Sequence, residues 1–305
     1  MKTQPTNFGF LFRFILPLVA ISALLFISVG SFSQNTTVVR LCQNATREIF
    51  RIEAPRQEFL PNDLVEIYRN QVDERRKILK QVLGGAWAAS DVGQAHQVAY
   101  ANLYNVLAPE IFCLGLIRIG HVSDGGKWLC NPQMMPKPCA IYSLGINNEY
   151  SFETEIYSLT KCHIHGFDKD QMGSGTVEAY KRINATIMPA YLAKETNASL
   201  GRYSFSDIAK MHNHSKIDIL KIDIEGGEYD VADQIVQVPI CQILIELHGA
   251  AKQMMGALET FSKSGFYLFH HEINGGNLKA SEFSLIHESC LKDYAVELVL
   301  GRYLS

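Results

Sequence analysis

The stretch from residue 217 to residue 230, Ile-Asp-Ile-Leu-Lys-Ile-Asp-Ile-Glu-Gly-Gly-Glu-Tyr-Asp, constrains the fold more than any other part of the chain. Apolar residues alternate along its first half as in a buried strand, and Gly226-Gly227 then permits a sharp turn into a helix. Carboxylates at the carboxyl end of a strand lie where open α/β sheets bind their ligands. Asp223 and Glu225 are therefore candidate site residues, although a solvated acidic turn after a strand explains the same spacing equally well.

Short apolar runs alternate with helical segments from about residue 113 onward. The predicted strands cover residues 140–144, 162–168, 217–224, 242–247, 267–269 and 283–286, and the predicted helices between them lie near 151–159, 227–236 and 250–264. This alternation predicts an α/β fold with a mostly parallel sheet and helices on both faces. The last two strands are expected to add an antiparallel end.

An uncharged apolar run of 19 residues, 14–32, sets the expected compartment. It is long enough for one membrane span, and the basic residues that precede it predict a cytosolic N-terminus and a lumenal remainder. A cleaved signal peptide is the alternative, because small residues near position 30 offer cleavage sites. Either reading places the chain from about residue 34 in the secretory pathway, as a single-pass Golgi or ER protein or as a secreted one.

Sequons and cysteines fit an oxidising lumen. Five sequons for N-glycosylation occur, at Asn35, Asn44, Asn184, Asn197 and Asn213. Six cysteines can form up to three disulfides, namely Cys113, Cys130, Cys139, Cys162, Cys241 and Cys290, while Cys42 is left over. We predict the pair Cys130–Cys139, because the two residues bracket a proline-rich loop.

The chain is predicted to contain four parts: a cytosolic tail and signal anchor over 1–33, a lumenal stem over 34–61, a helical N-terminal extension over 62–110 and a main domain over 111–305. Helical spacing predicts helices over 63–83 and 91–107 within the extension. A formal net charge of −3 gives no basic field for nucleic acid, so a nucleic-acid partner is not expected.

The first strand–turn–helix unit of the main domain suggests a nucleoside ligand. Gly145 in the turn lets the backbone approach the ligand, and Asp168, at the end of the second strand, can accept hydrogen bonds from ribose hydroxyls. The turn has one glycine and lacks the Gly-X-Gly-X-X-Gly of dinucleotide binders, which disfavours NAD and leaves S-adenosylmethionine. A plain turn with a surface aspartate is the alternative.

Several segments carry a family resemblance. They are residues 118–120, 124–130, 139–146, 151–153, 162–168, 220–228 and 245–248. In this order and spacing the chain resembles the FkbM-type methyltransferases, and within them the animal branch around methyltransferase-like protein 24. The resemblance covers about two thirds of the chain. It implies a class I methyltransferase (Rossmann-like) fold that uses S-adenosylmethionine.

The resemblance also implies the cofactor residues. Gly145 matches the first cofactor turn, Asp168 matches the ribose-binding acid, and Glu153 approaches the same pocket from the helix after the turn. Ser143 stands where class I enzymes usually carry an acid. The position of the cofactor's amino-acid end therefore stays open.

Three residues are predicted to be catalytic. Asp223 and Glu225 match the acidic strand end beside the methyl donor, and His248 ends the next strand. His248 is the first candidate for a general base, because the unperturbed pKa of histidine lies near neutrality, and Asp223 is the second. These residues and Glu246 could instead collect a divalent metal, but their acids suit sugar hydroxyls equally well, and no metal site is predicted.

Three functions remain open from the sequence. The favoured one is an S-adenosylmethionine-dependent methyltransferase of the secretory pathway that O-methylates a glycan or another hydroxylated acceptor. A metal-dependent Golgi glycosyltransferase is the first alternative, with Asp223-Ile-Glu225 as its metal-binding motif. The second is a non-catalytic lumenal binding module with a methyltransferase fold, which the serine at position 143 keeps open.

Overall fold

The structure is a computed structural model that describes residues 62–84 and 94–305. The predicted anchor, the stem and Cys42 lie outside the described residues. Within the described part of the chain, no helix combines the length and the apolar character that a membrane crossing requires.

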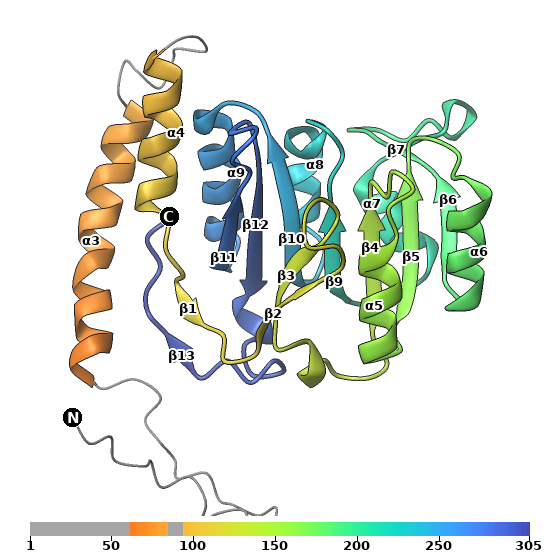
Figure 1. The fold of residues 1–305 in the computed structure, drawn as a ribbon, viewed down its shortest axis with the longest axis horizontal. Coiled ribbons are helices and arrows are strands. Elements are labelled where there is room, and N and C mark those ends of the chain that lie inside the picture. The colour runs from red at the N-terminus through yellow and green to blue at the C-terminus, as the bar shows by residue number, and fades with distance from the viewer. Residues whose placement is uncertain (1–61, 85–93) are drawn as a thin grey trace, which may run out of the picture. The chain divides into compact units, whose positions relative to one another are not determined.

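A seven-stranded sheet forms the centre of the domain (Figure 1). Its strands are β4 (Ala140–Leu144), β5 (His163–Asp168), β6 (Thr186–Pro189), β9 (Ile217–Ile222), β10 (Ile240–His248), β11 (Phe266–Ile273) and β12 (Ala280–His287). The order across the sheet is β6-β5-β4-β9-β10-β12-β11. The strands from β6 to β10 pair in parallel, whereas β12 runs antiparallel to both β10 and β11. The predicted, mostly parallel sheet with an antiparallel end is confirmed.

Counted in chain order, this arrangement is 3-2-1-4-5-7-6. It is the doubly wound order of a Rossmann-like sheet, with the last strand inserted antiparallel between the fifth and the sixth. The class I methyltransferase fold that the sequence implied has this order. The crevice at the carboxyl ends of the parallel strands is where such a sheet binds its ligand.

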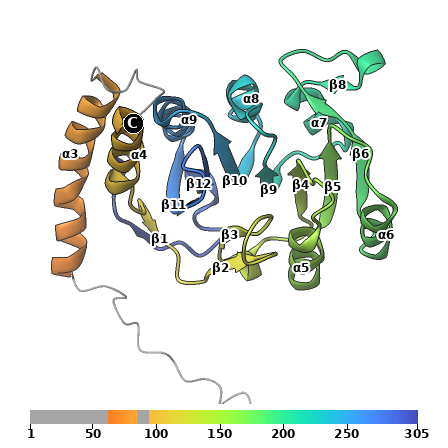
Figure 2. The same ribbon diagram turned by 45° about the horizontal axis from the view of Figure 1, so that its top comes forward.

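Helices cover both faces of the sheet, as predicted, and Figure 2 shows α8 and α9 on the side opposite α5. One face packs against α4 (Gln94–Val106), α7 (Phe205–Met211), α8 (Glu228–Ile235) and α9 (Ala251–Lys263). The other packs against α5 (Ser151–Thr160), α6 (Ser174–Arg182) and the hairpin of β2 (Leu116–Ile119) and β3 (Lys127–Cys130). Neighbouring residues of a strand face opposite layers, so Ile141 and Tyr142 enter different cores.

The predicted helical extension is part of this architecture. Helix α3 (Asn62–Gly84) packs against α4, and Tyr100 and Leu103 of α4 are fully buried in the core. The remaining elements are short: β1 (Ile111–Phe112) with β13 (Leu298–Val299), β7 (Tyr191–Leu192) with β8 (Arg202–Tyr203), and the 3-10 turns η2 (Pro132–Met134), η3 (Ala198–Leu200) and η4 (Glu288–Cys290).

All six expected cysteines form disulfides, but the predicted pair Cys130–Cys139 is wrong. The bonds are Cys113–Cys130, Cys139–Cys162 and Cys241–Cys290. Cys139 and Cys162 precede the neighbouring parallel strands β4 and β5, which brings their Cα atoms to 4.9 Å. The hairpin meanwhile carries Cys130 to within 5.5 Å of Cys113. Strand adjacency thus decided the pairing, and closeness in the sequence did not.

Candidate functional site

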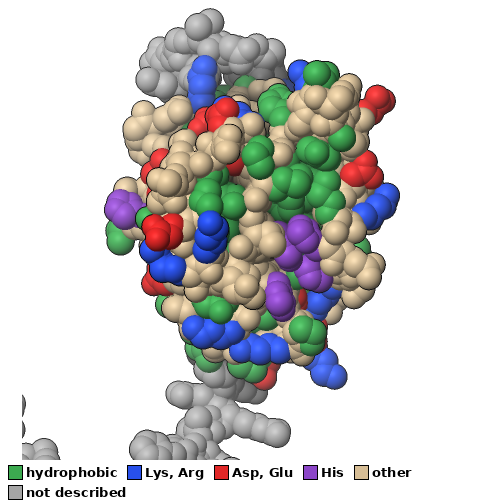
Figure 3. Space-filling model, turned by 90° about the vertical axis from the view of Figure 1, so that its right-hand side faces the viewer, with side chains coloured by type: hydrophobic (Ala, Val, Ile, Leu, Met, Phe, Trp, Pro, Cys, Tyr) green, Lys and Arg blue, Asp and Glu red, His purple; other side chains and the backbone are tan. Residues whose placement is uncertain are grey.

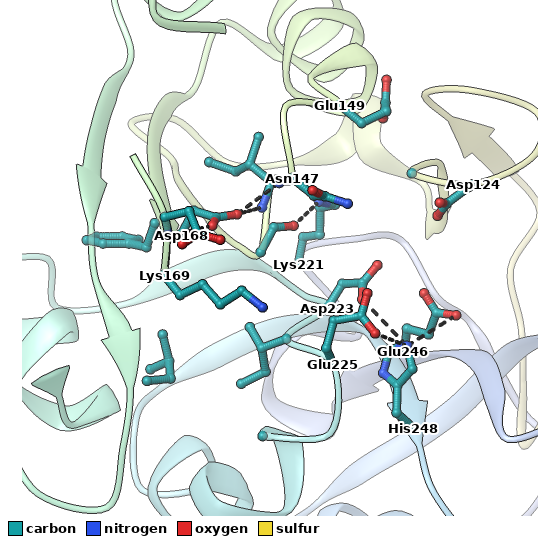
Figure 4. Close-up of a pocket in the computed structure, with 18 of the residues that line it drawn as sticks. Asp124, Asn147, Glu149, Asp168, Lys169, Lys221, Asp223, Glu225, Glu246 and His248 are labelled. Carbon is teal, nitrogen blue, oxygen red and sulfur yellow. Dashed lines mark hydrogen bonds and ion pairs between the residues drawn. The ribbon is translucent and has the colours of Figure 1, made fainter. Parts of the chain in front are cut away.

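A cavity of about 390 Å³ opens at the carboxyl ends of β4, β5, β9 and β10 (Figure 4). Predicted residues line it from both sides, namely Gly145, Asp168, Asp223, Glu225 and His248. Ser143 and Glu153 do not line it, because both are completely buried beneath the turn that follows β4. The cavity has two halves, one at the β4 turn and β5, and one at the ends of β9 and β10.

Gly145 forms the turn of the first half. Its φ is +76°, a region that side chains with a Cβ rarely occupy, and a Cβ here would lie 1.6 Å from the carbonyl oxygen of Asp223. Its amide donates to the Phe167 carbonyl at 2.8 Å. Only glycine lets the chain pass this close to the end of β9, and the turn that results lines the cavity.

Asp168 holds the same turn from the end of β5. Its Oδ2 accepts hydrogen bonds from the amides of Ile146 at 2.7 Å and Asn147 at 2.8 Å. Its Oδ1 accepts from the Asp170 amide at 2.9 Å. A carboxylate offers about four acceptor positions, so roughly one is left for a ligand hydroxyl. The predicted ribose acid therefore also shapes the turn, a role that the sequence did not reveal.

A buried network supports the turn from below. Ser143 Oγ donates to Glu153 Oε1 at 2.5 Å, and Lys221 Nζ lies 3.7 Å from the same oxygen. Lys221 also donates to the Gly145 carbonyl at 3.1 Å. Ser143 and Glu153 thus belong to the foundation of the turn, and of the three side chains only Lys221 reaches the cavity.

The second half is a cluster around His248. Its Nε2 lies 3.6 Å from Glu225 Oε2, 3.8 Å from Glu246 Oε1 and 3.9 Å from Asp223 Oδ1. Glu225 reaches the imidazole because the chain turns back sharply, with φ of +57° at Glu225 and +99° at Gly226. The three predicted catalytic residues are therefore brought together, with Glu246 among them.

Glu228, in the first turn of α8, orients the imidazole. Its carboxylate is completely buried, and its Oε1 lies 3.2 Å from His248 Nδ1 and accepts from the Ile224 amide at 2.9 Å. This contact leaves the Nε2 of His248 facing the carboxylates. Glu228 was not among the site residues predicted from the sequence, although it follows the Gly-Gly turn directly.

Lys127 approaches the same carboxylates from the other side. It comes from β3, its side chain is 1% exposed, and its Nζ lies 3.4 Å from Asp223 Oδ2 and 3.9 Å from Glu246 Oε2. It also forms an ion pair with Glu282 of β12. Burial alone would lower the pKa of Lys127, but these carboxylates raise it above its ordinary value. Lys127 is therefore a cation.

Burial and neighbouring charges shift the pKa values of the clustered side chains in different directions. Burial raises the pKa of Asp223, but the ammonium of Lys127, a hydrogen bond with Glu246 and the nearby cations Lys221 and His248 together hold that pKa below its ordinary value. Burial, together with Asp223 and Glu282, raises the pKa of Glu246 to about 8. Burial disfavours charge on His248, but the hydrogen bond to Glu228 and the nearby carboxylates raise its pKa to about 9. Folding therefore favours the ionised form of Asp223, the protonated form of Glu246 and the imidazolium form of His248.

A second group of histidines lies on the face of the sheet that α7 covers, and Figure 3, viewed toward the β6 edge of the sheet, shows histidine side chains gathered on that side of the molecule. The ring of His165 stacks on that of His212, with centroids 3.6 Å apart, and lies 5.1 Å from that of His214. Burial and these neighbours lower the pKa of His165 to about 3. None of these three histidines lines the cavity.

Loops supply cavity residues that the sequence did not indicate. They are Asp124, Gly125, Asn147, Glu149, Lys169, Asp170, Asn274 and Asn277. Loop side chains follow no strand or helix period, so their convergence on one site depends on the complete fold.

Two curated relatives match part of the chain. The human and rat proteins described as "Probable methyltransferase-like protein 24" are 24% and 22% identical over 127 residues. Each match covers 38% of this chain and 34% of the relative, so the chain spans about a third of the length of these relatives.

Among solved structures, M. capricolum TrmK in complex with S-adenosyl-homocysteine is 10% identical, with a TM-score of 0.36 over 52% of this chain and 66% of that chain. Aeropyrum pernix fibrillarin with bound S-adenosyl-L-methionine is 11% identical, with a TM-score of 0.35 over 58% and 85%. These likenesses are loose, and the fold assignment rests on the strand order. A family profile described as "Methyltransferase domain" matches residues 66–287, well over half of the chain. The chain therefore belongs to this methyltransferase domain family.

Proposed function

We propose that this protein is an S-adenosylmethionine-dependent methyltransferase of the secretory pathway that O-methylates a glycan or another hydroxylated acceptor. The proposal rests on one cavity that has two halves. One half is the turn held by Asp168, and the other is the cluster of carboxylates around the imidazole of His248. Family membership supplies the reaction class. Assignment to the FkbM type, and to the branch around methyltransferase-like protein 24, belongs to the same proposal.

The donor fits the half built by Gly145 and Asp168. The remaining acceptor position of Asp168 suits a ribose hydroxyl, and the ionised Asp223 favours a sulfonium cation beside it. S-adenosylmethionine, when bound, supplies an activated methyl group, so positioning provides much of the rate. The two solved structures named above are complexes of this cofactor or its product.

The acceptor fits the half built by Asp223 and His248. A hydroxyl oxygen there forms a bond to the sulfonium methyl carbon while the carbon–sulfur bond breaks, and its proton passes to the carboxylate of Asp223. The hydrogen bond to Glu228 and the nearby carboxylates raise the pKa of His248 and favour its imidazolium form, which suits stabilisation of the attacking oxygen better than removal of a proton. Asp223 thus replaces His248 as our first candidate for the base.

Three features support a secretory location. The apolar run over 14–32 suits a signal anchor, the described cysteines form three disulfides, and the sequons at Asn184, Asn197 and Asn213 are exposed. Membership of a methyltransferase family favours this function over the Golgi glycosyltransferase.

Calorimetric titration of the full-length protein with S-adenosyl-homocysteine tests the donor site. We expect saturable binding that weakens by about 10-fold, or about 1.4 kcal/mol, in Asp168→Ala, because both the turn and the hydroxyl contact lose their acceptor. Glu178→Ala, an exposed change on α6, is the matched control and should bind as wild type. A folded wild-type protein that binds none of this ligand would overturn the methyltransferase proposal and leave the metal-dependent glycosyltransferase and the non-catalytic binding module. Positive binding justifies a screen of glycans for methyl transfer.

A further inference from the structure

The carboxylates of the acceptor half lie between two cations. Asp223 presents Oδ1 to His248 and Oδ2 to Lys127, and Glu246 presents Oε1 to His248 and Oε2 to Lys127. Each carboxylate therefore has a positive group on both sides. On the cavity side the positive group is the imidazole, which is partly exposed, and on the far side it is an ammonium that solvent does not reach.

The side chains on the cavity side are of types that ligate divalent metals. Asp223, Glu246 and His248 each offer one ligand atom, and these atoms lie within 4.8 Å of one another. The contact between Glu228 and the second ring nitrogen of His248 is of the kind that orients metal-ligating histidines. Two carboxylates and an imidazole suit Mn²⁺.

The positive charge of Lys127 disfavours a divalent metal at this position. Divalent-metal affinity rises with the number of uncompensated ligand charges, and the ammonium already compensates one of the two carboxylates. It is buried, so its repulsion of a second cation is poorly screened. It is also firmly held, because Glu282 pairs with it and the hydrogen bonds between Gln242 and Cys130 fix β3 against β10.

We propose that Lys127 is the built-in counter-ion of the acceptor half, a positioning residue that occupies the electrostatic role of a divalent cation and holds the Asp223 carboxylate in place beside the acceptor. The wild-type cluster therefore takes no divalent cation, and methyl transfer needs none. Removal of the lysine turns Asp223, Glu246 and His248 into a metal site. The statement on methyl transfer rests on the proposed function, whereas the statements on metal binding do not.

Titration of the full-length protein with Mn²⁺, followed by the loss of the free-ion electron paramagnetic resonance signal, tests this directly. We expect wild type and Lys127→Arg, which keeps the charge, to leave Mn²⁺ free. Lys127→Ala should bind one Mn²⁺ per chain at least about 10-fold more tightly than wild type, and a further His248→Ala change should abolish that binding.

Loss of the lysine alone leaves Asp223, Glu246 and Glu282 without their shared cation and can prevent folding. The pair Lys127→Met and Glu282→Gln removes one acid together with the lysine and keeps the charge balance, so it provides a second variant with the same expected gain of Mn²⁺ binding. Tight Mn²⁺ binding by wild type that disappears in His248→Ala would overturn the proposal. So would a folded charge-balanced variant that binds no Mn²⁺.

S-adenosyl-homocysteine binding by the same wild-type sample separates the two proposals. If that ligand fails to bind while the Mn²⁺ results hold, the proposed function fails and the counter-ion role of Lys127 stands. If the ligand binds and wild type also captures Mn²⁺ through His248, the donor site stands and the counter-ion role fails.

Discussion

At the scale of single residues, the site depends on backbone that tolerates one amino acid. Gly145 combines a positive φ with an approach to the Asp223 carbonyl that leaves no room for a Cβ. Its conformation couples the turn after β4, which belongs to the proposed donor half, to the end of β9, which carries the proposed acceptor half. A change at this position must therefore disturb both halves together.

We expect Gly145→Ala to lower the free energy of unfolding by roughly 3 kcal/mol or more, because backbone strain and a steric clash add. Gly175→Ala is the matched control, since Gly175 lies in α6 and a Cβ added there would have no atom within 4 Å. That control should be neutral or slightly stabilising. Urea unfolding of both variants measures the difference, and equal stabilities would contradict the close contact at Gly145.

At the scale of elements, the sequence predicted what local periodicity encodes. Apolar spacing predicted the strands β4, β5, β9 and β10 and the helices α5, α8 and α9, and Asp223 and Asp168 came with the strand ends, whereas α6, the helix that follows β5, was not predicted. The partners of Lys127 did not, because Asp223 lies 96 residues away and Glu282 lies 155 residues away. A buried ion pair between distant strands leaves no pattern in either one.

At the same scale, the loop lengths closed by two disulfides predict which of the two bonds stabilises the protein more. Cys241–Cys290 closes a separation of 49 residues and Cys139–Cys162 one of 23. Chain entropy then predicts that replacing both cysteines of a bond by alanine lowers the free energy of unfolding by about 4 kcal/mol for the first bond and about 3 kcal/mol for the second. Equilibrium unfolding of the two double variants tests the order. The reverse order would show that packing around each bond outweighs loop entropy.

At the scale of the whole molecule, the charged cluster ties stability to pH. The pKa values of Glu246 and His248 are raised on folding to about 8 and about 9, from ordinary values of 4.5 and 6.5. A group with a raised pKa holds its proton more tightly in the folded state. Its stabilising effect is therefore complete below the ordinary value and is lost as the pH rises through the folded value.

Thermal unfolding should consequently occur at a lower temperature at pH 9.5 than at pH 7, by on the order of 3–5 °C. Glu246→Gln should reduce this decrease, because an amide keeps the uncharged state without needing a proton. Scanning calorimetry across this range makes the comparison. An unchanged pH dependence in Glu246→Gln would mean that Glu246 is already ionised at neutral pH.

The bond Cys113–Cys130 has a consequence for how the protein matures. Cys130 ends the strand that begins with Lys127, so this cystine fastens the segment that delivers the ammonium to its carboxylates. A newly made chain with free thiols would hold that segment by pairing and packing alone. Completion of the charged cluster is thereby linked to oxidation of a thiol pair, and the redox history of the chain becomes a condition for assembly of the proposed acceptor site.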